Sequence, residues 1–67
     1  MVYKKIKLIG TSNQNFQEAI ENALVEASKT VRNIVWYQVI EFKGPIKDGK
    51  IEEYQAEVEF EFKIEET

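Results

Sequence analysis

The chain has no cysteine and no histidine among its 67 residues. Their absence excludes disulfides, thiolate chemistry and zinc sites built on these residues, and it removes the most frequent general base near neutral pH. There is also no run of about 20 apolar residues, so no membrane-spanning helix is expected. The opening residues 1–5 lack the apolar core of a signal peptide. These absences predict a cytoplasmic protein that is not an enzyme.

Charge and length narrow the class further. Nine Lys and Arg residues against twelve Asp and Glu give a net charge of -3, whereas nucleic acids and anionic membranes are bound through a basic surface. We therefore expect neither as a partner. A chain of this length forms one domain, residues 1–67, and buries only about 60% of the surface that its unfolded chain exposes. Without disulfides or zinc, self-association is the expected source of additional stability.

The first half of the chain predicts a strand followed by a helix. Residues 2–9 alternate roughly and include β-branched and aromatic side chains, and we expect this strand to stop at Gly10. Residues 16–31 predict an amphipathic helix, because apolar side chains recur at steps of three and four: Phe16, Ala19, Ile20, Ala23, Leu24, Ala27 and Val31. Its start is expected at the capping residues Thr11, Ser12 and Asn13.

The second half predicts two strands joined by a hairpin. Residues 34–42 are rich in β-branched and aromatic residues, and the turn residues Gly44-Pro45 and Asp48-Gly49 follow them. Residues 54–64 alternate strictly between apolar and polar side chains, which is typical of a strand with one buried face.

The order strand, helix, strand, strand limits the possible topologies. A right-handed crossover returns the second strand parallel to the first, and the hairpin reverses the third, which fits between the other two. The fold class is therefore expected to be α+β, with a three-stranded antiparallel sheet of order 1-3-2 and one helix across a single face. Lys5 and Lys7 would then lie beside Glu57, Glu59 and Glu61. We interpret these acids as a solvated or interface surface and not as a metal site.

The second strand is apolar on both faces, and one helix covers only one of them. Its even positions include Ile34 and Trp36, and its odd positions include Tyr37 and Val39. An edge strand that exposes such side chains favours association, so we expect a subunit interface here. If the odd positions pack on the helix, Trp36 faces away from it, on the side of Gln55. An indole and a carboxamide would suit a flat ligand with a polar edge.

These residues also carry a resemblance to a known family. The strand Val2-Tyr3-Lys4-Lys5, the Gly10-Thr11-Ser12 run, Trp36, the hairpin at 44–49 and the pair Tyr54-Gln55 follow one another at matching spacing. In these features the chain resembles the dodecins. The resemblance implies a hollow homododecamer of cubic symmetry that binds flavins in pairs near two-fold axes, for storage or sequestration.

The resemblance also implies roles for individual residues. Trp36 would stack on the isoalloxazine ring of FMN or riboflavin, within a Trp, flavin, flavin, Trp stack across a two-fold axis, and Gln55 would bind the pyrimidine edge. Lys43 and Lys63 stand where some bacterial relatives carry arginine, and they would meet a phosphate as point charges. Those relatives also hold coenzyme A through basic residues. Here Lys4, Lys29 and Arg32 are the candidates, but Glu26 and Ser28 replace expected arginines, so coenzyme A binding is not expected.

Two other function classes remain open. A helix on a curved antiparallel sheet also resembles the cystatin-like inhibitors in outline, and such a protein-interaction module would use the second strand as its docking edge. A flavoenzyme ranks last, because the chain offers no histidine, no cysteine and no acid isolated in an apolar pocket.

Overall fold

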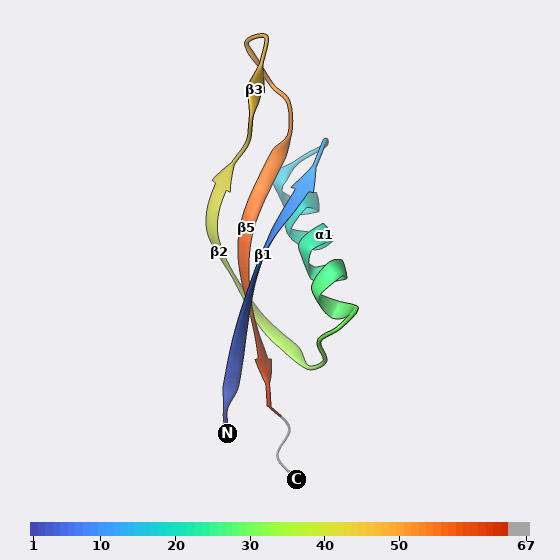
Figure 1. The fold of residues 1–67 in the computed structure, drawn as a ribbon, viewed down its shortest axis with the longest axis vertical. Helices are drawn as coiled ribbons and strands as arrows, with labels where there is room; N and C mark the ends of the chain where they lie inside the picture. Colours follow the sequence, from blue (N-terminus) through green and yellow to red (C-terminus); the bar gives the residue numbers. More distant parts are fainter. Residues whose placement is uncertain (65–67) are drawn as a thin grey trace.

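A computed structural model describes residues 1–64 of the chain. Six elements follow one another: β1 (Tyr3–Ser12), α1 (Phe16–Ser28), β2 (Ile34–Lys43), β3 (Ile46–Lys47), β4 (Lys50–Ile51) and β5 (Tyr54–Lys63). The three long strands form an antiparallel sheet of order β1-β5-β2, with α1 on one face (Figure 1). This confirms the α+β class and places the third long strand between the other two, as the topology rules predicted.

Strand β1 does not stop at Gly10 but continues to Ser12. Gly10 is buried beneath the helix, and a Cβ atom there would overlap the carbonyl oxygen of Ala19 and meet the Cβ atom of Ala23 at 2.9 Å. Glycine is therefore needed here for the close approach of β1 to α1, and not to end the strand.

The helix begins three residues later than the predicted capping cluster. The side chain of Asn15 is the N-cap and accepts a hydrogen bond from the backbone N–H of Glu18 at 2.7 Å. Ser12 shapes the preceding turn: its Oγ accepts from the N–H of Gln14 at 2.8 Å and donates to Oε2 of Glu18 at 3.1 Å. The start at Phe16 matches the predicted range, but the N-cap is Asn15 instead of Thr11, Ser12 or Asn13, and the helix ends at Ser28 instead of Val31.

The core is small and depends on alanine on its helical side. The buried apolar residues are Ala19, Ala23 and Ala27 of α1 with Ala56, Val58 and Phe60 of β5. Of the larger apolar side chains of the helix, Ile20 packs against this core, whereas Leu24 and Val25 are 40% and 60% exposed. Because α1 packs closely on β1 and β5 through its alanines, it leaves β2 largely uncovered.

The hairpin carries a second, two-stranded sheet that the sequence analysis did not predict. Ile46 pairs with Ile51 and Lys47 with Lys50, around a turn in which Asp48 and Gly49 have φ values of 53° and 76°. Two successive positive φ values match the right-handed twist of the flanking strands. The hairpin projects beyond the helix (Figure 1), and the molecule measures 54 × 19 × 14 Å.

Candidate functional site

The edge strand β2 contains two register shifts, and each of them changes which side chains lie on the same face of the sheet. Ile34 is opposite Phe62, but Trp36 is opposite Glu61, and a second shift lies between Val39 and Glu41. The side chains on the helix side are therefore Ile34, Tyr37, Val39 and Phe42. Neither the odd nor the even positions alone pack inward, because each bulge inserts one residue and inverts the alternation.

Trp36 shares the outer face of the sheet, because its partner Glu61 belongs to the polar alternation of β5. Its side chain is 64% exposed, and Tyr37 on the opposite face is 59% exposed. The prediction that β2 is an edge strand with large uncovered side chains is confirmed, but one face was expected to be covered by the helix, whereas large side chains are exposed on both faces.

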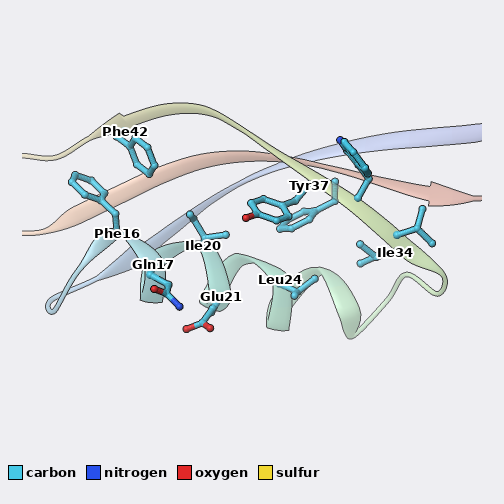
Figure 2. Close-up of a pocket in the computed structure, with 11 residues that line it drawn as sticks. Phe16, Gln17, Ile20, Glu21, Leu24, Ile34, Tyr37 and Phe42 are labelled. Carbon is cyan, nitrogen blue, oxygen red and sulfur yellow. The ribbon is translucent and has the colours of Figure 1, made fainter.

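A groove of about 780 Å³ lies between α1 and β2. Figure 2 shows Ile20 and Leu24 on the helix below, with Tyr37 and Phe42 extending from β2 above. The ring of Phe16 closes one end, with centroids 4.7 Å from Phe42 and 5.1 Å from Tyr54. The residues that line it are Phe16, Gln17, Ile20, Glu21, Leu24, Ile34, Val35, Trp36, Tyr37, Phe42 and Phe60, so Trp36 borders the groove from the edge strand although its register partner Glu61 belongs to the outer face. The groove is thus an apolar channel with one acidic residue.

The outer face of the sheet carries a ladder of ion pairs. Lys5 lies 3.3 Å from Glu59, and Glu57 binds Lys7 at 3.5 Å and Lys43 at 3.7 Å. The predicted placement of Lys5 and Lys7 beside these acids is confirmed. Within residues 1–64, no cluster of acidic side chains has the arrangement of a metal site.

The four candidate ligand-binding residues separate into two pairs at opposite ends of this face. Lys43 is opposite Gln55, and Trp36 is opposite Glu61, two residues before Lys63. Six residues along β5 separate Gln55 from the partner of Trp36, which at about 3.3 Å per residue is roughly 20 Å. One chain therefore does not bring Trp36 and Gln55 to the same small ring system.

Gln55 has a partner that the sequence analysis missed. Its Nε2 donates a hydrogen bond to Oε1 of Glu53 at 2.8 Å, and both residues are half-buried. The sequence offered one indication of this contact: Glu53 and Gln55 are two residues apart, and residues i and i+2 of an extended chain point to the same side. Lys29, one of the coenzyme A candidates, is paired with Glu26 at 2.8 Å.

No helix within residues 1–64 is long and apolar enough to cross a membrane.

Comparison with known proteins gives one consistent result over nearly the whole chain. A family model described as Dodecin matches residues 2–65. A dodecin from Thermus thermophilus is 44% identical over 66 residues, which cover 98% of this chain and 96% of that protein. A crystal structure of a T. thermophilus protein superimposes with a TM-score of 0.93 at 44% identity, covering 98% of this chain and 97% of the other. The structure of dodecin from Streptomyces coelicolor has a TM-score of 0.92 at 32% identity, covering 98% and 94% of the two chains. The chain belongs to the dodecin family.

Proposed function

We propose that this protein binds flavins without catalysing a reaction, and that it stores or sequesters them in a homododecamer. The observation that carries the proposal is Trp36, a large aromatic side chain that is 64% exposed on the outer face of an edge strand. An exposed indole offers a π face, and stacking contributes about 0.5–1.5 kcal/mol beyond the area that it buries. Membership of the dodecin family supports a flavin as the stacked ring.

Each flavin site is composed of residues from more than one subunit. Trp36 stacks on the isoalloxazine ring, and the two-fold related subunit supplies the second Trp36 of a Trp, flavin, flavin, Trp stack. Gln55 binds the pyrimidine edge of the ring. Since Trp36 and Gln55 of one chain lie roughly 20 Å apart along the sheet, the Gln55 that meets a given ring comes from a different chain than the Trp36 that stacks on it.

The flavin is FMN or riboflavin, and the two lysines decide between them. Lys43 is opposite Gln55 and is paired at 3.7 Å with Glu57, which also binds Lys7. A ligand phosphate would compete with this carboxylate for the Lys43 ammonium group. Lys63 is exposed near Trp36 and is the second candidate for a phosphate contact.

A storage role follows from the stacking. An indole in contact with an excited flavin quenches it by electron transfer, and a flavin pair held between subunits excludes other reactants. Bound flavin would therefore be dark and unreactive. The residues around Trp36 offer no histidine or cysteine for catalysis, in keeping with a binding protein.

The test is a titration of riboflavin and FMN fluorescence with the purified protein, together with a sedimentation measurement of its mass. We expect quenching that saturates near one flavin per chain, on a species twelve times the mass of one chain. A flat titration with a monomeric protein would contradict the proposal. It would instead favour a protein-interaction module of cystatin-like outline, with the edge strand β2 as its docking edge.

A further inference from the structure

The carboxylate of Glu53 lies beside Gln55, just before β5 begins, and the backbone of residues 52–53 is held in place by neighbouring contacts. Nε2 of Gln55 donates to Oε1 of Glu53 at 2.8 Å. The backbone beneath it is tied to the other arm of the hairpin, because the N–H of Glu52 donates to the carbonyl of Pro45 at 2.9 Å. A Cβ atom on Gly44 would overlap the carbonyl oxygen of Glu53. The Glu53 side chain therefore starts from a backbone position that has little room to move.

The hydrogen bond to Glu53 fixes the orientation of the Gln55 amide, with its nitrogen toward the carboxylate. An ionised carboxylate only accepts hydrogen bonds, so it selects the nitrogen end of the amide and excludes the flipped orientation. Without this partner, the terminal torsion of a glutamine side chain is broad and roughly two-fold, and both orientations are populated. A hydrogen bond with one ionised partner is also stronger than one between neutral groups.

We propose that Glu53 is a positioning residue that orients the Gln55 carboxamide toward the imide edge of a flavin ring. This inference rests on the flavin-binding function proposed above. Gln55 has two N–H donors and one carbonyl acceptor, and Glu53 occupies one of the donors. The remaining N–H and the carbonyl oxygen form a donor and acceptor pair. The pyrimidine edge of isoalloxazine presents the complementary pair, a ring N–H next to a carbonyl.

The consequence for ligand choice is specific. A ligand that lacks the ring N–H leaves the Gln55 carbonyl unpaired, and an unpaired buried acceptor is costly. A Gln55 amide that is held in place cannot rotate to avoid this loss. The protein should therefore discriminate against 3-methylriboflavin, in which a methyl group replaces the hydrogen of this N–H, and the discrimination should depend on Glu53.

The experiment measures the affinities of riboflavin and 3-methylriboflavin for the assembled protein and three variants, by fluorescence quenching. Glu53→Ala removes the carboxylate, and Glu53→Gln keeps an acceptor of similar size without the charge. Glu52→Ala is the matched control, because it makes the same charge change one residue away at an exposed side chain. Sedimentation shows whether each variant still assembles, and Glu53→Gln serves as the test if Glu53→Ala does not.

We expect the wild type and Glu52→Ala to prefer riboflavin over the methylated ligand by about tenfold or more, the value of one hydrogen-bond mismatch. Glu53→Ala should weaken riboflavin binding several-fold and reduce this preference, and Glu53→Gln should fall between. Equal affinities and preferences in Glu53→Ala and wild type would overturn the role of Glu53 while leaving flavin binding intact. If the wild type binds neither ligand, the proposed function fails as well.

Discussion

Trp36 and Gln55 lie on the same face of the sheet but at its opposite ends, because Trp36 pairs with Glu61, six residues along β5 from Gln55. The four proposed ligand-binding residues therefore form two pairs on a single chain: Trp36 lies near Lys63, and Gln55 is opposite Lys43. In the flavin site proposed above, the Trp36 half of one chain would therefore meet the Gln55 half of another.

Mixed assemblies test this division directly. Trp36→Ala and Gln55→Ala subunits are unfolded together, refolded as an equal mixture and titrated with riboflavin. Each variant alone should bind weakly, but about a quarter of the sites in the mixture should combine an intact Trp36 from one subunit with an intact Gln55 from another. Binding no greater than that of the two variants alone would show that both residues of a site come from the same chain.

Trp36 is expected to contribute to the affinity for the flavin and not to the assembly of the subunits. Trp36→Ala should weaken riboflavin by at least about tenfold and abolish its quenching, since it removes both the stacking and the buried area. Trp36→Phe keeps a smaller π face and should bind with intermediate affinity. Tyr37→Ala is the control on the opposite face, where the side chain has similar exposure, and its assembled fraction should still quench. Loss of both binding and assembly in Trp36→Ala would identify Trp36 as an assembly contact.

Lys43 is expected to distinguish FMN from riboflavin. Lys43→Ala should lower the affinity for FMN by about three- to tenfold and leave that for riboflavin nearly unchanged, because only FMN carries a phosphate. Lys43→Arg should raise the preference for FMN, since a guanidinium binds phosphate through two hydrogen bonds. Lys47→Ala, on the projecting hairpin, makes the same charge change away from Gln55. An equal loss for both flavins in Lys43→Ala would mean that this lysine does not contact the phosphate.

Gly10 is expected to control the packing of α1 on β1. Gly10→Ala should lower the free energy of unfolding by about 2–3 kcal/mol or more, because the new methyl group overlaps the backbone of Ala19. Gly49→Ala is the matched control: it has open space around it but a φ of 76°, and should cost about 1 kcal/mol. Urea denaturation at a fixed protein concentration measures both. Similar losses for the two variants would contradict the close approach seen at Gly10.

The central strand shows what sequence patterns predict well. β5 is paired on both sides and free of bulges, so its alternation translates directly into burial of Ala56, Val58 and Phe60. The same regular alternation made it possible to predict that Lys5 and Lys7 of β1 lie beside the glutamates of β5.

The edge strand shows where such patterns fail. β2 has a partner on one side only, so its two irregularities disturb few hydrogen bonds, and its sequence is apolar in both alternations. The alternation therefore gave no sign that Ile34 and Tyr37 share a face. The Glu53–Gln55 contact was missed because it depends on side-chain conformation, which residue spacing permits but does not determine.

The alanine face of α1 limits how much stability a single chain gains by folding. Three alanines bury little apolar area, and much of the apolar surface of the chain lies instead on β2 and in the groove. If the proposed assembly covers this surface with other copies, the chain would obtain much of its stability from association. Its melting temperature should then rise with protein concentration, as mass action requires when folding and association are coupled. Dilution would thus release stored flavin and loosen the fold together.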